Sequence, residues 1–281
     1  MSEKPVQPIR QWPAARGLGW VSGSWELFRR QPLRLLLISL FFQFFLSFSQ
    51  VDVLGLLVIL CLPVFSAGML HAFLLVEQGE KPMLVVLFLA FRSKNSITRL
   101  LLLGGVVMAL GLLIKTLVLA GQMVDIDPEI LRRIEQGDLD ALQLIDPQMM
   151  ENTIIAMALA ATLSGIMTYF SVPLIWFKKM GTGSAVTMGL KALGRNWRPL
   201  LVIGILLGLL AVPIALLFVS FYLSALSDGT ASTGLAFLLL LLGPMFQLLL
   251  FGTQYMAFRD IFGLDEMTGG YGKNAGDQLV A

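Results

Sequence analysis

Long apolar runs constrain this sequence more than any other feature. A helix needs about 20 consecutive apolar residues to cross about 30 Å of hydrocarbon, because each residue adds about 1.5 Å. Six runs approach or reach this length in the chain of 281 residues, at 33–49, 53–76, 100–121, 154–177, 200–226 and 235–258. The sequence therefore predicts an all-α integral membrane protein with six transmembrane helices.

The composition argues against the soluble classes of protein. Hydrophobic residues make up 57% of the chain and charged residues 14%, whereas about 25% charged residues are usual in soluble domains. One Cys and one His leave little for disulfide, thiol or zinc chemistry. We therefore do not expect a cytosolic enzyme, a nucleic-acid-binding protein or a disordered chain.

The basic residues are divided unequally between the two sides of the predicted membrane domain. Segments 1–34, 77–99, 178–198 and 259–281 hold 17 of the 20 Lys and Arg residues, whereas 122–151 holds two. Because positive flanks resist translocation, this asymmetry predicts that both termini are cytoplasmic. The loop at 122–151 carries eight acidic residues, and we expect it on the outer side.

One pattern occurs three times on the cytoplasmic side: an interfacial segment, a basic cluster and a pair of spans. In the first copy, apolar residues recur at helical spacing over 17–30, and residues 186–197 repeat this arrangement in the third copy. The middle copy, at 82–95, is almost entirely apolar before its basic residues. We expect three helical hairpins, each preceded by a cytoplasmic interfacial segment. They form one membrane domain (1–262), which a flexible cytoplasmic tail follows (263–281).

The interfacial segments combine basic side chains with Trp and Phe, which favours contact with lipid headgroups. Amphipathic rings suit the headgroup region, and basic side chains are attracted to an anionic surface. The residues expected at the lipid interface are Trp20, Trp25, Phe28, Arg29, Arg30, Lys191, Arg195 and Trp197. The expected partners are membrane lipids with anionic headgroups and no nucleic acid, while protein partners stay open.

A second set of polar residues lies inside the predicted spans. Unpaired amides and ammonium groups are unfavourable in hydrocarbon, so these side chains should face other helices or a polar path. The candidates for a polar path are Gln43, Lys115, Gln247 and Gln254. We favour helix packing for the glutamines, and Lys115 is near enough to the outer end of its span to extend to water.

Proline inside four spans keeps a transport function open. The residues are Pro63, Pro173, Pro213 and Pro244, and each removes one backbone hydrogen bond and can kink its helix. Broken helices of this kind form substrate sites in many transporters. If the polar-path residues lined one cavity, a small-solute transporter or channel would gain support, and if they were scattered it would lose support.

No catalytic or metal-binding motif is present in the sequence. His71 has no further metal ligand at i±3 or i±4, so we expect it to form an interhelical hydrogen bond. Asp125, Asp127 and Glu129 alternate as in a calcium loop, but Ile130 stands where that loop requires Gly. We therefore expect no enzymatic activity, no cofactor and no metal.

The first interfacial segment also carries a family resemblance. Its residues are Ala14-Ala15-Arg16-Gly17-Leu18-Gly19-Trp20, Gly23, Trp25, Leu27-Phe28-Arg29-Arg30 and Pro32. They resemble the opening of an uncharacterised family of six-span proteobacterial inner-membrane proteins of unknown function. That layout is distantly similar to YciC-type proteins and to the membrane domain of glycerophosphodiester phosphodiesterases. The resemblance implies a multi-pass protein of a bacterial inner membrane and brings no catalytic residue. The predicted function is therefore non-enzymatic, either membrane-organising or lipid-interacting.

Overall fold

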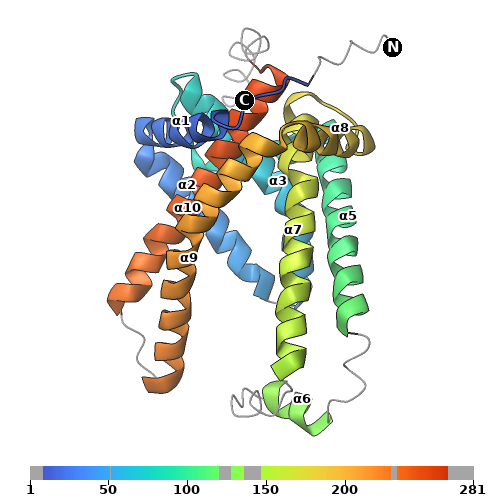
Figure 1. The fold of residues 1–281 in the computed structure, drawn as a ribbon, viewed down its shortest axis with the longest axis vertical. Helices are drawn as coiled ribbons and strands as arrows, with labels where there is room; N and C mark the ends of the chain where they lie inside the picture. Colours follow the sequence, from blue (N-terminus) through green and yellow to red (C-terminus); the bar gives the residue numbers. More distant parts are fainter. Residues whose placement is uncertain (1–8, 51, 120–127, 136–146, 229–232, 265–281) are drawn as a thin grey trace.

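The computed structural model describes residues 9–50, 52–119, 128–135, 147–228 and 233–264, and its regular elements are all helices (Figure 1). The long helices are α3 (Asp52–Glu77), α5 (Lys94–Leu119), α7 (Pro147–Phe177), α9 (Trp197–Asp228) and α10 (Thr233–Phe262). The shorter elements are α1 (Arg16–Arg30), α2 (Pro32–Ser47), η1 (Phe48–Gln50), η2 (Leu84–Phe88), α4 (Leu89–Arg92), α6 (Pro128–Glu135) and α8 (Thr182–Arg195).

Five of these helices are long and apolar enough to cross a membrane, which is consistent with a multi-pass membrane protein. They are α3, α5, α7, α9 and α10. The first predicted span is shorter than expected, because α2 has 16 residues, or about 24 Å at the rise of an α-helix. Beyond Ser47 the chain continues as the 3-10 helix η1.

Helices α7 and α10 are among those that extend past the predicted spans. Helix α7 begins at Pro147, so residues 147–151 belong to this helix and not to the predicted outer loop. Proline suits a first helical position, where its missing N–H is not needed. Helix α10 continues beyond residue 258 to Phe262 and so includes Arg259 and Asp260. Parts of the predicted outer loop (120–127 and 136–146) and most of the predicted tail (265–281) lie outside the described residues.

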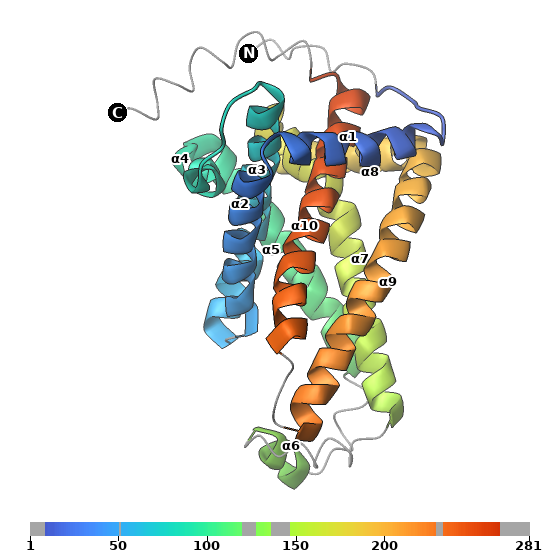
Figure 2. The ribbon, with the colours of Figure 1, turned by 90° about the vertical axis from the view of Figure 1, so that its left-hand side faces the viewer.

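The two amphipathic helices lie across one end of the bundle. Figures 1 and 2 show α1 and α8 at this end, which we call the α1/α8 end, and α6 at the other end. Helix α10 contacts α1, α2, α3, α7 and α9, and α5 packs between α3 and α7. Large buried side chains gather toward the α1/α8 end, including Trp20, Phe73, Phe170, Tyr255 and Phe258. This end is therefore the best-packed part of the fold.

Proline does not interrupt the helices in the described structure. The helices α3, α7, α9 and α10 run through Pro63, Pro173, Pro213 and Pro244. At Pro244 the carbonyl oxygen accepts a hydrogen bond of 3.1 Å from the Ser39 hydroxyl of α2. The middle interfacial segment, by contrast, forms only the short elements η2 and α4, in agreement with its weaker match to the other two copies.

Candidate functional site

Helix α1 packs against the bundle through a face that combines the small residues Gly17 and Ser24 with Trp20 and Leu27. The buried residues of this face are Gly17, Trp20, Ser24 and Leu27, at spacings of three, four and three. A Cβ atom on Gly17 would clash with the Pro199 carbonyl oxygen of α9. The Ser24 hydroxyl donates a hydrogen bond of 3.2 Å to the Leu249 carbonyl oxygen of α10. Small residues thus allow α1 to approach both helices closely.

The opposite face of α1 presents bulky apolar and basic side chains. Trp25 is 44% exposed, and Leu18 is also exposed. Phe28 is half-buried, and its ring centroid lies 5.2 Å from that of Trp25. Arg29 and Arg30 are exposed on the following turn. Three of the residues predicted for the lipid interface, Trp25, Arg29 and Arg30, are therefore exposed on this helix, and Phe28 packs between Trp25 and the core.

Helix α8 follows the same rule on the other side of the α1/α8 end. Its buried residues are Ala185, Gly189 and Ala192, and a Cβ atom on Gly189 would lie 3.3 Å from Ser171 Oγ of α7. Lys191, Arg195 and Trp197 are exposed. The Arg198 guanidinium carbon lies 5.6 Å from the Trp197 ring centroid. The small residues of α8 face the bundle, and its basic residues face outward.

The prediction that Trp20 lies at the lipid interface is wrong. Its side chain is 0% exposed, and its indole N–H donates a hydrogen bond of 2.7 Å to Asp260 Oδ2. Trp20 belongs to the α1 face that also carries Gly17 and Ser24, which turns its ring toward α10. The buried carboxylate satisfies the polar edge of the ring in place of a lipid headgroup.

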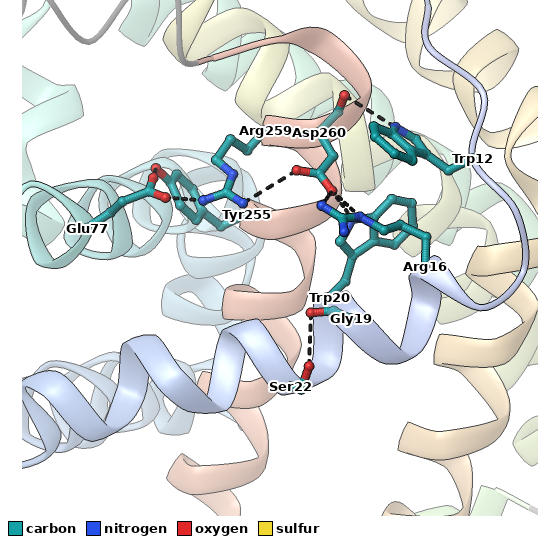
Figure 3. Close-up of polar contacts among 9 residues, drawn as sticks. All are labelled: Trp12, Arg16, Gly19, Trp20, Ser22, Glu77, Tyr255, Arg259 and Asp260. Atoms are coloured by element: carbon teal, nitrogen blue, oxygen red, sulfur yellow. Dashed lines mark hydrogen bonds and ion pairs between the residues drawn. The ribbon is translucent and has the colours of Figure 1, made fainter.

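Asp260 lies at the centre of a polar cluster that joins α1 to α10 (Figure 3). Its Oδ2 atom accepts hydrogen bonds of 2.7 Å from Trp20 Nε1 and from Arg16 Nε. Its Oδ1 atom lies 3.5 Å from Arg259 Nη2, and its carbonyl oxygen accepts a bond of 3.3 Å from Trp12 Nε1. Asp260 is only 8% exposed, so these groups replace water around its charge.

Arg259 extends this cluster to α3. It forms an ion pair with Glu77, the last residue of α3, and the Tyr255 hydroxyl donates a hydrogen bond to the same carboxylate. The two carboxylates of the cluster are balanced by Arg16 and Arg259. We define the Asp260 cluster as Trp12, Arg16, Trp20, Glu77, Tyr255, Arg259 and Asp260. Because its charges are balanced and bonded to one another, it acts as a clamp that holds three helices together.

The segment before α1 adds to this attachment. The side chain of Asn196, between α8 and α9, is buried and accepts a hydrogen bond of 3.0 Å from the Trp12 amide. It donates a bond of 3.1 Å to the Arg10 carbonyl oxygen. The Arg10 amide in turn donates to the Ile261 carbonyl oxygen at 3.2 Å. These bonds tie the segment that leads into α1 to the start of α9 and the end of α10.

Comparisons with protein-family models, with curated proteins and with solved structures found no match. The family resemblance of the N-terminal segment therefore stays a prediction. Within the described residues, no group of three or more His, Cys, Asp and Glu side chains could hold a metal ion. The function must be inferred from the chemistry and geometry of the α1/α8 end.

The glutamines proposed for a polar path bind different neighbouring helices. Gln247 Oε1 accepts a hydrogen bond of 2.7 Å from the Ser39 hydroxyl of α2. Gln254 Nε2 donates a bond of 2.5 Å to the Tyr169 carbonyl oxygen of α7. Both glutamines are buried. Their side chains therefore join α10 to two separate helices, as expected if these glutamines stabilise contacts between helices.

Gln43, a third candidate for the polar path, lies at another helix contact. Gln43 Nε2 lies 3.5 Å from the position of a Cβ atom on Gly243, which places it at the contact between α2 and α10. The side chain of Lys115 lies outside the described part of the structure. The described polar-path residues are thus distributed along helix contacts.

A further group of polar contacts lies between α3, α5 and the end of α7. The Trp176 indole N–H donates a hydrogen bond of 3.4 Å to His71 Nδ1, which confirms the interhelical bond expected for this histidine. The Lys179 ammonium lies 4.3 Å from the Trp176 ring centroid and 3.4 Å from Ser96 Oγ. Arg99 donates a hydrogen bond to the Lys179 carbonyl oxygen. Partial burial and the nearby Arg99 charge lower the pKa of Lys179.

Proposed function

We propose that the chain is a non-enzymatic integral protein of a bacterial inner membrane, and that it binds anionic phospholipid headgroups at its cytoplasmic side. In this proposal α2, α3, α5, α7, α9 and α10 are six spans arranged as three hairpins, and both termini are cytoplasmic. A single observation carries the proposal. Helix α1 leaves Trp25, Arg29 and Arg30 exposed, and at the other side of the same end Lys191 and Arg195 of α8 and Trp197 at the start of α9 are exposed as well.

This arrangement differs from that of an amphipathic helix on a soluble protein. Such a helix buries its bulky apolar stripe in the core. Helix α1 buries Trp20 and Leu27 but also exposes Leu18 and Trp25, which is favourable when the surroundings are themselves apolar. The adjacent Arg29 and Arg30 then lie where headgroup phosphates are found, since Trp and basic residues are both enriched at the membrane interface.

The short α2 helix fits a six-span arrangement if the membrane adapts to it. Its 16 residues cover about 24 Å, less than the ~30 Å of a typical hydrocarbon core. Local thinning of the bilayer accommodates a short span at a modest free-energy cost. Together with lipid binding, such thinning would give the protein a membrane-organising role.

The alternative function, transport of a small solute, has less support. Gln247 and Gln254 contact different helices, and the helices run through their prolines without interruption. A transporter of the broken-helix type would use unwound backbone to bind its substrate. We therefore retain lipid binding as the proposed function.

Native mass spectrometry of the protein released from bacterial membranes tests this proposal. We expect the wild-type protein to retain anionic phospholipids in preference to zwitterionic ones. The double variant Arg29→Gln/Arg30→Gln should retain fewer anionic lipids. The matched control is Arg132→Gln/Arg133→Gln, which removes two charges from α6 at the opposite end and should retain the wild-type number. Equal retention of anionic and zwitterionic lipids by the wild type would refute the proposal.

A further inference from the structure

A groove of about 510 Å³ lies beside α1. In this region α1 crosses α9 and α10 (Figure 2). Its apolar walls come from Leu18, Val21 and Trp25 of α1, Leu206 of α9 and Leu249 of α10. Gly19 and Ser22 complete the lining. The volume falls in the range of about 300–1,000 Å³ that is usual for sites of small molecules. It suits a ligand the size of part of a lipid better than a protein segment.

The groove reaches from the interfacial helix toward the apolar part of the bundle. Val202 of α9 lies against Gly17 of α1, and Leu206 is about one turn, or about 6 Å, further along α9. Leu249 lies beside α1, because its carbonyl oxygen accepts a hydrogen bond from the Ser24 hydroxyl. If α1 lies at headgroup level, Leu206 lies about one turn deeper, toward the acyl chains.

A basic residue follows the groove-lining residues on the same face of α1. Leu18, Ser22, Trp25 and Arg29 follow one another at spacings of four, three and four, so they share one face of α1. Arg29 is one turn beyond Trp25, or about 6 Å along the helix axis. It is exposed, and it forms no ion pair with the described residues. A positive charge beside an apolar groove complements a lipid that has a phosphate next to an acyl chain.

We propose that this groove binds one acyl chain of an anionic glycerophospholipid, and that Arg29 binds the phosphate of the same molecule. The inference rests on the proposed function and assigns one lipid to a specific site. The methyl and methylene groups of the chain contact Leu206, Leu249 and the Trp25 ring. Arg29 provides N–H donors for the phosphate oxygens, a geometry that guanidinium groups favour.

Photo-crosslinking of the full-length protein tests this site. The probe is phosphatidylglycerol with a diazirine in the middle of one acyl chain, incorporated in vesicles, with crosslinked residues mapped by mass spectrometry. We expect the crosslinks to concentrate on Leu206, Leu249 and the α1 segment 18–25. Unlabelled phosphatidylglycerol should compete better than phosphatidylcholine by about fivefold, the factor that one basic residue contributes near an anionic headgroup. Crosslinks spread evenly along α9 would overturn the proposal.

Two variants that fill the groove make the test specific. Leu206→Trp places a bulky indole ring in the groove. The control is Leu209→Trp, which changes a residue of the same helix that is 68% exposed and does not line the groove. Ser22→Phe fills the groove from the exposed face of α1 and serves if Leu206→Trp does not fold. We expect either groove variant to lose the crosslinks and the control to keep them. Unchanged crosslinking in a folded groove variant would contradict the proposal.

The effect of Arg29→Gln separates this inference from the proposed function. If the groove binds the lipid, this variant should lose the preference for phosphatidylglycerol over phosphatidylcholine while acyl-chain crosslinks to Leu206 remain. If native mass spectrometry still detects anionic lipid but Leu206 is not crosslinked, the groove proposal fails and the proposed function stands. If no preference for anionic lipid is detected by either method, the proposed function fails as well.

Discussion

The indole nitrogen of Trp20 lies 2.7 Å from Oδ2 of Asp260, and this bond joins the first helix to the last helix of the fold. Both side chains are buried. The same carboxylate oxygen lies 2.6 Å from Arg16 Nη2. The bond fixes the rotation of α1 about its own axis, since Trp20 must face α10. As a result, Trp25 and Arg29 face away from the bundle.

Removing the Asp260 carboxylate should destabilise the protein and loosen α1. The Asp260→Ala variant leaves the buried Trp20 indole N–H without an acceptor, which costs about 1–3 kcal/mol. We expect a clear decrease in the Tm of the purified protein in detergent. The control is Glu26→Gln, which removes an exposed pair with an N···O distance of 3.6 Å to Arg30 and should cost at most about 1 kcal/mol. Similar small decreases for both variants would contradict a clamping role for Asp260.

The close approach of α1 to α10 can be tested at a glycine. A Cβ atom on Gly252 would clash with Ser24 and lie 2.9 Å from Phe73 Cε1. Gly252→Ala should therefore destabilise the fold by about 1–3 kcal/mol through overpacking, although Ala is the better helix former. Gly208→Ala on α9 is the matched control, because a Cβ atom there meets nothing within 4 Å. If Gly252→Ala were as stable as Gly208→Ala, the α1–α10 contact would be looser than described.

The lowered pKa of Lys179 gives a test of the α5–α7 contact. Partial burial of the ammonium is its first cause and the positive charge of Arg99 is its second. Arg99→Gln removes the repelling charge, so the pKa of Lys179 should rise. At a fixed pH below this pKa, a smaller fraction of Lys179 is then deprotonated. We expect slower acylation of Lys179 by an N-hydroxysuccinimide ester.

Two controls accompany this experiment. Arg99→Lys keeps the positive charge and should keep a rate near that of the wild type. Lys191, exposed on α8, should react at the same rate in all three proteins. Faster acylation of Lys179 in Arg99→Gln would show that Arg99 acts on access to the amine and not on its charge.

The sequence predicted the helical content because long apolar runs and basic flanks are local signals. It also predicted helix α1, because the bulky stripe recurs at helical spacing, and Trp25 of that stripe is exposed. It placed Trp20 wrongly. The partner of this side chain, Asp260, is 240 positions away, and no local pattern carries that information.

The Asp260 cluster was missed for a related reason. The apolar run of α10 ends at residue 258, and charged residues beyond such a run are normally assigned to the aqueous phase. One signal could have shown that the helix continues. Gly263 has φ 62° and is a typical helix stop, so the helix was free to reach Phe262 with Arg259 and Asp260 inside it. Their partners in α1 and α3 are set by tertiary packing alone.

The proposed membrane orientation rests on the distribution of basic residues, and it can be tested in whole cells. In a Cys61→Ala background, a Cys at Asp138 or Asp228 should react with a membrane-impermeant maleimide. A Cys at the exposed Ser184 of α8 should react only after lysis, because the α1/α8 end should be cytoplasmic. If a Cys at position 184 reacted in intact cells, the proposed orientation would be wrong.

The preference for anionic lipid is the central claim, and electron paramagnetic resonance of spin-labelled lipids tests it most directly. In reconstituted vesicles, the fraction of motionally restricted phosphatidylglycerol should exceed that of phosphatidylcholine, and the excess should fall as salt screens the charges. The variant Arg29→Gln/Arg30→Gln/Lys191→Gln/Arg195→Gln should lose most of this excess, since each basic residue near an anionic surface contributes about 1 kcal/mol. Equal restricted fractions for the two lipids with the wild-type protein, at low salt, would contradict the account.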